Sequence, residues 1–465
     1  MSTSTLARPA TGRAGTVPGL GPLVVVLAGT FVTFLDFFIV NVALPSIHAD
    51  LHADSVAMSL VVAGYGVTFA AGMITGGRLG DLHGRRRMFT IGLALFTVTS
   101  ALCGAAPSAT ALVVARALQG AAGAMLTPQV LAILGTTYEG PRRDRAFAAY
   151  GFAMGIAGVL GQLLGGALIQ ADLAGLGWRA IFLINVPVGL VALAFVRRVV
   201  PESRGPAARL DVVGTLLAAV AIAALVVPLV QGRERGWPVW SWLMLASAPV
   251  LGGVFVGHQA ARARRGLAAL VDLTLFRSRS FAVGSLAGMA FGLVPSAFFF
   301  VLALYLQQGR GYSALFSGVV FAAVGAGYFA ALLLAAGLAA RLGHQVLALG
   351  AVLAAAGALT LAWQAHASSA WALVPGLVLV GFGIGAVLVP LSSTVLAGVD
   401  ARLAGAAAGV LSTAQQVGGA VGVAVIGVAF FAAGTVVHGF VVSLCVVAGL
   451  TVVTAVLAQL LRRAR

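Results

Sequence analysis

Residues 22–45 read PLVVVLAGTFVTFLDFFIVNVALP, an apolar run that contains one charged residue, Asp36. A helix needs about 20 mostly apolar residues to cross the hydrocarbon core of a bilayer, and this run is long enough. Further runs of the same kind follow, separated by polar, charged or turn-forming breaks. The sequence therefore predicts an all-α membrane protein with fourteen spans, at about 22–45, 55–77, 88–106, 109–135, 146–169, 178–196, 211–231, 238–257, 281–306, 313–339, 345–363, 371–396, 404–431 and 437–461.

The composition agrees with a chain that lies mostly inside a membrane. Of its 465 residues, 60% are hydrophobic and 9% are charged, and its mean hydropathy is +1.06. A soluble domain carries about 25% charged residues, so a soluble globular protein is excluded. No gap between spans exceeds about 25 residues, which leaves no room for a soluble domain. The first 21 residues lack the pattern of a cleaved signal peptide, so we expect the first span to stay in the mature protein.

The positive charge follows the predicted topology. The net charge of +16 comes from 28 basic residues, all of them arginine, against 12 acidic ones. Twenty-three arginines lie on one side of the predicted spans, four lie on the other, and Arg116 lies within a span. Cytoplasmic loops carry the excess of basic residues, so we expect both termini in the cytoplasm. Because a nucleic-acid-binding protein gathers its basic residues on one folded face, we expect no nucleic-acid partner.

The sequence contains no pattern typical of a catalytic or metal site. Cys103 and Cys445 lie within apolar runs, where cysteine behaves as a small buried hydrophobe. The histidines are scattered near span ends and in loops, and no nucleotide-binding loop or nucleophilic triad is visible. We therefore expect no enzyme activity, no metal and no bound cofactor.

A weak internal repeat predicts two halves. Residues 77–84, GRLGDLHG, follow the second span, and residues 337–343, GLAARLG, follow the tenth. Repeated halves are common in membrane proteins that move solutes. We expect six-helix halves at 22–200 and 281–461, an inserted pair of spans with an arginine-rich loop at 201–280, and tails at 1–21 and 462–465.

Asp36 is the acidic residue that lies deepest inside a predicted span, and Arg116 is the basic residue that does so. A charged side chain at the centre of a membrane helix costs about 2.5–3.5 kcal/mol on insertion scales, so such residues are functional candidates. At 1.5 Å per residue, both lie roughly 10–12 Å below the outer boundary. We predict that they share one aqueous pocket, in which Asp36 carries a proton and Arg116 tunes it. The alternative is a static buried ion pair that only fixes helix packing.

Six segments resemble the signature segments of the fourteen-span drug:proton antiporters of the major facilitator superfamily. They are LDFFIVNVALP, GGRLGDLHGRRRMF, VARALQGAAGAM, GQLLGGAL, WRAIFLINVPVGL and AGVLSTAQQVGGAVGVAV. The resemblance implies a monomeric exporter in a bacterial plasma membrane, powered by the proton gradient and working by alternating access. Its implied substrates are small amphipathic or cationic organic compounds such as antibiotics. The alternative is a proton-linked transporter dedicated to one metabolite, either an exporter or an uptake carrier.

The resemblance also implies roles for individual residues. A positively charged loop that only sets topology would explain the arginines between the second and third spans, but not Asp81. Arg116 matches the arginine of the fourth-span motif, to which assistance in proton transfer is ascribed. The family has a cytoplasmic motif between the second and third spans, and the resemblance implies that this motif latches the two halves in one conformation. The residues that match it are Gly77, Asp81, Gly84, Arg85 and Arg86.

The fifth span departs from the family pattern. The family's antiporter motif has proline after its first glycine, whereas here Gly161 is followed by Gln162. The later glycines of the motif are present as Gly165 and Gly166. The missing proline removes a helix kink, which keeps the dedicated-metabolite alternative open. Gln162 is expected to contact either a substrate or a neighbouring helix.

Aromatic and amide side chains near the middle of the spans are candidates for an adaptable apolar binding surface. The alternative for each of them is packing or contact with lipid. The predicted substrate-cavity residues are Phe34, Phe37, Asn41, Tyr65, Gln119, Gln162 and Tyr305.

Overall fold

The structure is a computed structural model that describes residues 19–204, 211–232, 235–267, 269–343, 345–367, 369–396, 399 and 404–462. Within these residues, 14 helices are long and apolar enough to cross a membrane, which confirms the predicted number of spans. The same residues contain no strand, as an all-α fold requires. Residues 1–18 of the predicted N-terminal tail and 463–465 of the C-terminal tail lie outside the described part.

The first six spans form one bundle around their own apolar clusters. Asp54 and Ser108 each cap a helix by accepting a hydrogen bond from a backbone N–H in its first turn. Gly84, with φ of 103°, makes the tight turn between the second and third spans. The helices are α1 (Leu20–Leu51), α2 (Ser55–His83), α3 (Arg85–Gly104), α4 (Ala109–Thr137), α5 (Gly140–Ala171), and α6 (Ala180–Leu183) with α7 (Asn185–Val199), which share the sixth span.

The inserted pair consists of α8 (Val212–Gln231) and α9 (Val239–Arg264). Asp211 ties their cytoplasmic ends together, because its carboxylate accepts hydrogen bonds from His258 (2.9 Å) and Gln259 (2.8 Å) and lies 3.5 Å from Arg262. Burial raises the pKa of the Asp211 carboxyl, but hydrogen bonds from His258, the Gly214 N–H and Gln259, with the charge of Arg262, outweigh it and hold that pKa below its ordinary value. The pair is therefore fastened by a charged carboxylate at the membrane surface.

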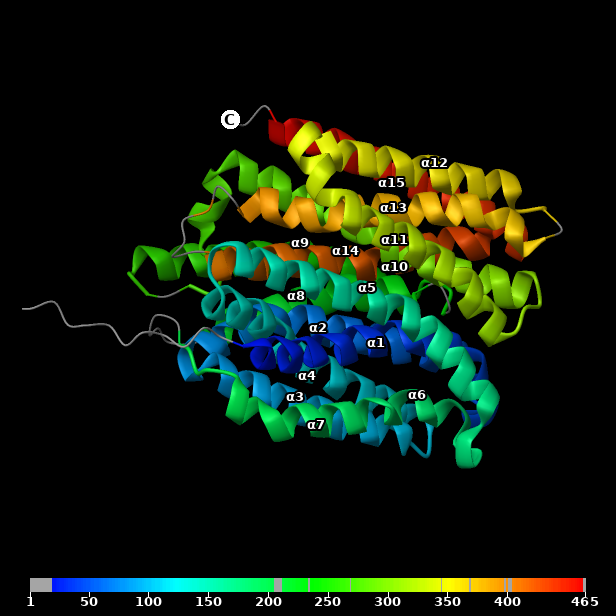
Figure 1. The fold of residues 1–465 in the computed structure, drawn as a ribbon, viewed down its shortest axis with the longest axis horizontal. Helices are drawn as coiled ribbons and strands as arrows, with labels where there is room; N and C mark the ends of the chain where they lie inside the picture. The colour runs from blue at the N-terminus through cyan, green and yellow to red at the C-terminus, as the bar shows by residue number, and fades with distance from the viewer. Residues whose placement is uncertain are drawn as a thin grey trace, which may run out of the picture.

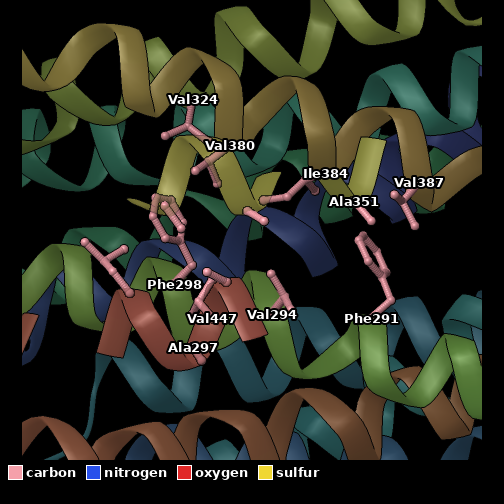
Figure 2. Close-up of a cluster of buried hydrophobic side chains, with 14 of the residues drawn as sticks. Phe291, Val294, Ala297, Phe298, Val324, Ala351, Val380, Ile384, Val387 and Val447 are labelled. Carbon is pink, nitrogen blue, oxygen red and sulfur yellow. The ribbon is translucent and has the colours of Figure 1, made fainter. Parts of the chain in front are cut away.

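The last six spans surround a separate apolar core. Figure 2 shows part of it, with Phe291 and Phe298 of one helix directed toward aliphatic side chains of its neighbours. Two of these helices approach closely because Gly418 faces the backbone of Met289 and Gly422 faces that of Leu293. The helices are α10 (Arg279–Leu304), α11 (Ala314–Leu342), α12 (Gln345–Gln364), α13 (Val374–Leu396), α14 (Ala404–Ala432) and α15 (Val436–Arg462).

The spans lie side by side along the longest axis of the molecule, with α3 and α7 at one side, α12 and α15 at the other, and α5 and α14 near the middle (Figure 1). The two bundles meet where α5 packs on α11 and where α2 packs on α14. Tyr328 of α11 donates a hydrogen bond to the Gly151 carbonyl of α5 (3.3 Å). Nearer the middle, the rings of Phe38 and Phe299 lie 5.3 Å apart. The interface between the bundles is thus mostly apolar, and the candidate site lies beside it.

Candidate functional site

Asp36 lies at the centre of a buried polar cluster inside the first bundle. Its Oδ2 accepts a hydrogen bond from Nη1 of Arg116 (2.5 Å). Its Oδ1 accepts two more, from Nε2 of Gln119 (2.9 Å) and Nδ2 of Asn185 (3.0 Å). Helices α1 and α4 therefore form an ion pair to which α7 adds a hydrogen bond, and the predicted proximity of Asp36 and Arg116 is observed as direct contact.

A second layer of side chains supports this cluster from α3. The Ser100 hydroxyl accepts hydrogen bonds from Gln119 (3.1 Å) and Asn185 (3.0 Å) and donates one to the Phe182 carbonyl (2.9 Å). The Cys103 thiol contacts Oε1 of Gln119 (3.4 Å). Sequence reasoning missed Ser100 and Asn185 as site residues. The signal for Asn185 was an amide in the middle of the apolar segment WRAIFLINVPVGL.

Arg116 has partners besides Asp36. Its Nε donates a hydrogen bond to the Val61 carbonyl (3.1 Å), and its Nη1 also donates to Oε1 of Gln119 (2.8 Å). The guanidinium carbon lies 4.4 Å from the centre of the Tyr65 ring, within cation–π range. The positive charge of Arg116 is consequently held in place by several neighbours, whatever the charge on Asp36.

The ion pair is sealed from solvent. The side chain of Asp36 is 0% exposed and that of Arg116 is 1% exposed. Neither residue lines either of the two central cavities described below. The prediction that Asp36 and Arg116 share an aqueous pocket is therefore wrong. Side chains from α3 and α7 fill the space around the carboxylate, and Tyr65 covers the guanidinium.

A cavity of about 210 Å³ lies between the two bundles, toward the cytoplasmic half of the membrane. We call it the inner cavity. Helices α1, α2, α4 and α5 form one wall, and α10, α11, α13 and α14 form the other. Tyr65, whose ring covers Arg116, is also one of the residues that line this cavity. The lining is rich in aromatic side chains, among them Phe34, Phe37, Phe38, Tyr65, Phe291 and Phe299.

A second cavity of about 510 Å³ lies toward the outer side, and we call it the outer cavity. Its walls come from α1, α2, α10 and α14, and α8 of the inserted pair adds Val226 and Leu229. The two cavities share Phe37, Ser296 and Gln416 as lining residues. These three side chains therefore separate the inner cavity from the outer one.

The predicted cavity residues divide into two groups. Phe34, Phe37 and Tyr65 line the inner cavity, and Asn41 and Phe37 line the outer one. Gln119 instead belongs to the polar cluster around Asp36.

The other two predicted cavity residues lie away from both cavities. Gln162 is 0% exposed, and its Nε2 donates a hydrogen bond to the Phe38 carbonyl (2.9 Å), so it makes the helix contact that was the alternative to a substrate contact. Tyr305 is also buried, because its ring stacks on Phe440 with 4.0 Å between the ring centres and its hydroxyl donates to the Ala365 carbonyl.

The glycines of the fifth span allow α5 to lie against α1. A Cβ at Gly161 would lie 3.1 Å from Phe38 and 3.2 Å from Leu35, and one at Gly165 would lie 2.8 Å from Ile39. Gly166 is buried on the same helix. This close approach is the physical use of the small residues.

The predicted latch residues cluster at the cytoplasmic turn between α2 and α3. Oδ1 of Asp81 lies 2.9 Å from Nη2 of Arg85. The Arg86 N–H donates to Glu202 (3.0 Å), and the Arg86 guanidinium donates to the Val200 carbonyl (3.2 Å). Glu202, which sequence reasoning missed, also fills the space beside Gly84.

These latch contacts all lie within the first half of the chain. A Cβ added at Gly77 would lie 3.5 Å from Pro128 of α4, an ordinary contact distance. In the described residues, the ion pairs of Arg85 and Arg86 are with Asp81 and Glu202, so the expected bridge between the two halves is not seen. The connection between α13 and α14, at 397–398 and 400–403, lies outside the described residues.

Comparison with known proteins places this arrangement in a family. A family model described as Major Facilitator Superfamily matches residues 26–423. The chain is 40% identical over 419 residues to a "Probable actinorhodin transporter" of Streptomyces coelicolor, covering 88% of this chain and 72% of that protein. It is 36% identical over 469 residues to a puromycin resistance protein of Streptomyces alboniger, covering 94% and 90% of the two chains.

A solved structure agrees in fold. The crystal structure of a human organic anion transporter matches with a TM-score of 0.65 at 18% identity, over 94% of this chain and 99% of that one. The resemblance seen in the sequence is thereby confirmed, and the chain belongs to the Major Facilitator Superfamily.

Proposed function

We propose that this multi-pass protein of the bacterial plasma membrane exports small organic compounds, antibiotics among them, in exchange for protons. Its relatives at 35–40% identity include proteins named for actinorhodin transport, puromycin resistance and cephamycin export. The observation that carries the proton-coupling part is the buried Asp36–Arg116 pair, which lies behind one wall of a cavity between the bundles. The compound occupies the cavity, and the proton occupies Asp36.

Asp36 is suited to carry a proton because its neighbours tolerate both of its charge states. When Asp36 is ionised, Arg116 balances its charge at 2.5 Å. When Asp36 is protonated, Arg116 keeps its contacts with the Val61 carbonyl, Gln119 and the Tyr65 ring. A buried charge that lost its only partner would be strongly destabilising. The cluster avoids that cost, which supports a reversible proton site rather than a static ion pair.

Tyr65 connects the proton site with the compound. One side of its ring lies over Arg116, and the ring also lines the inner cavity. Protonation of Asp36 weakens its own attraction for the guanidinium, so α1 shifts relative to Arg116 and the Tyr65 wall, which stay together. A bound compound can shift the balance between two conformations of the protein only if it contacts them differently. Tyr65 supplies such a contact between the compound and the proton site.

Alternating access requires a barrier that opens to one side at a time. Phe37, Ser296 and Gln416 separate the inner cavity from the outer one, and Phe37 directly follows Asp36 in α1. The two bundles rock about this barrier, so that the compound moves from the inner to the outer cavity. The proton gradient supplies the energy. The protein works as a monomer, with no bound cofactor, nucleic-acid partner or catalytic step of its own.

A drug panel tests the direction of transport. The chain is expressed in a bacterial host that lacks its own efflux pumps, and the host is challenged with puromycin and other antibiotics. Export predicts a rise in the inhibitory concentration for some compounds and loss of that rise with a protonophore. Greater sensitivity would instead favour the alternative of an uptake carrier, and resistance that survives the protonophore would contradict proton coupling.

Replacement of Asp81 by asparagine is expected to slow turnover. The change removes the ion pair with Arg85 at the α2–α3 turn, where Asp81 lines neither cavity, and it keeps the size of the side chain. The maximal transport rate should fall about threefold to tenfold, with little change in the half-saturating concentration, because the motif acts on the conformational step. Initial rates in everted vesicles, with the panel compound that gives the strongest resistance, measure both quantities. Equal turnover with tenfold weaker binding would contradict the latch role.

A further inference from the structure

We infer that the inner cavity selects flat aromatic compounds that carry no positive charge, and that Thr127 and Gln415 bind the hydrogen-bonding groups of these compounds. This inference rests on the proposed function, in which the inner cavity holds the exported compound. The sequence led us to expect amphipathic or cationic substrates, and this inference excludes the cationic ones. Charge, ring geometry and two polar atoms without partners support it independently.

The charge around the cavity opposes cations. Of the described residues that line the inner cavity, none is acidic or basic, and His48 is the one ionisable residue that lines the outer cavity. The nearest charges belong to the Asp36–Arg116 pair behind Tyr65. That pair has no net charge when Asp36 is ionised and a net positive charge when Asp36 is protonated. At no point of the cycle does the site supply a negative charge, so a cation would exchange its hydration for the attraction of ring faces alone, without a counter-ion.

The aromatic lining fits flat ring systems. Phe299 and Phe321 stack with ring centres 5.8 Å apart, and Phe38 meets Phe299 edge-on at 5.3 Å. From the first bundle, Phe37 and Tyr65 add a tilted pair at 6.1 Å. Rings from both bundles therefore face the same cavity. Flat ring systems bind such surfaces by stacking and edge-to-face contacts.

Two buried polar atoms at the cavity have no hydrogen-bond partner. Thr127 of α4 is 5% exposed and lines the cavity, and its hydroxyl is without a partner among the described residues. Gln415 of α14 lines the cavity from the other bundle, and its buried Nε2 is likewise without one. A buried polar group left unsatisfied is costly, so a compound that satisfies it gains affinity. The amide Nε2 can only donate, and it therefore matches a carbonyl oxygen on the compound.

Equilibrium binding of two matched probes tests the charge preference. Acridone is a flat, uncharged tricycle with one carbonyl group, and N-methylacridinium is a tricycle of similar size with a permanent positive charge. Each is titrated at pH 7 against the full-length protein in nanodiscs, with empty nanodiscs as the blank, and binding is followed by probe fluorescence. We expect acridone to bind at least about tenfold more tightly than the cation, because the cation is desolvated without a counter-ion. Tighter binding of N-methylacridinium, or no binding of acridone, would overturn the inference.

Matched variants test the two polar residues. Gln415→Leu and Thr127→Val should each weaken acridone binding about threefold to tenfold, the change expected from loss of one hydrogen bond. Gln364→Leu and Thr413→Val are the controls, since these residues also carry a buried polar atom without a partner but line neither cavity. Size-exclusion profiles show whether each variant is folded. Unchanged acridone binding in both folded test variants would remove Thr127 and Gln415 from the site.

These measurements need no gradient, so their outcome is separate from that of the proposed function. If acridone binds as expected but its transport does not depend on a pH gradient, the substrate class stands and proton coupling fails. If gradient-driven transport is observed for cations only, proton coupling stands and the substrate class fails.

Discussion

Replacement of Asp36 by asparagine is expected to reduce proton-coupled transport to the level of vesicles without the protein. Asparagine has nearly the size of aspartate and can still accept hydrogen bonds through its one oxygen, but it cannot take up and release a proton. The measurement is substrate-driven proton release from proteoliposomes, read with a pH-sensitive dye inside the vesicles. Substrate binding should persist, since Asp36 lines neither cavity.

Asp54→Asn is the matched control for this variant. Asp54 caps α2 by accepting a hydrogen bond from the Ala57 N–H (2.7 Å), and asparagine caps helices about as well as aspartate. The control should therefore transport like the unchanged protein. Coupled exchange at the normal rate by Asp36→Asn would show that the proton travels on another group.

Replacement of Arg116 by methionine is expected to destabilise the protein strongly. The change leaves the Asp36 carboxyl fully buried without its cation, and loss of one partner from a buried pair costs about 3–5 kcal/mol unless the carboxyl takes up a proton. Arg179→Met removes an ion pair of partly exposed side chains, with Asp50 at the outer surface, and such pairs contribute about 0–1 kcal/mol. Melting temperatures of the purified variants in detergent should differ accordingly.

The double variant Asp36→Asn with Arg116→Met separates charge from packing. Because no charge is then left buried without a partner, most of the lost thermal stability should return. A double variant that melts no higher than Arg116→Met alone would mean that the arginine acts through its packing against Tyr65 and Val61, rather than through its charge.

The spans were predictable because each is a long apolar run, and their number needs no knowledge of tertiary contacts. Their ends were less predictable. The first span was expected at 22–45, whereas α1 runs over Leu20–Leu51, because a helix continues past the hydrocarbon core into the interface. The sixth span breaks between α6 and α7 at Ile184. Pro187 accounts for the break, since it has no N–H to donate to the Leu183 carbonyl.

The site was predictable in depth but not in lateral position. Equal depths brought Asp36 and Arg116 to one level, and they are indeed in contact. Which helix faces turn toward them cannot be read from helices that are apolar on all sides, because such helices carry no directional pattern. Tyr305 was therefore placed at a cavity that its ring faces away from, and Asn185 was overlooked although it hydrogen-bonds Asp36.

In the proposed export cycle, the inserted pair affects the path of a released compound, because α8 forms part of the wall of the outer cavity. Val226 and Leu229 of α8 lie at the cavity wall, and α8 packs on both α2 and α14. A bundle without this pair would lose the part of the wall that α8 supplies beside α2 and α14. In the proposed export cycle, a compound in the outer cavity therefore meets the apolar side chains of α8 on that side instead of an opening between α2 and α14.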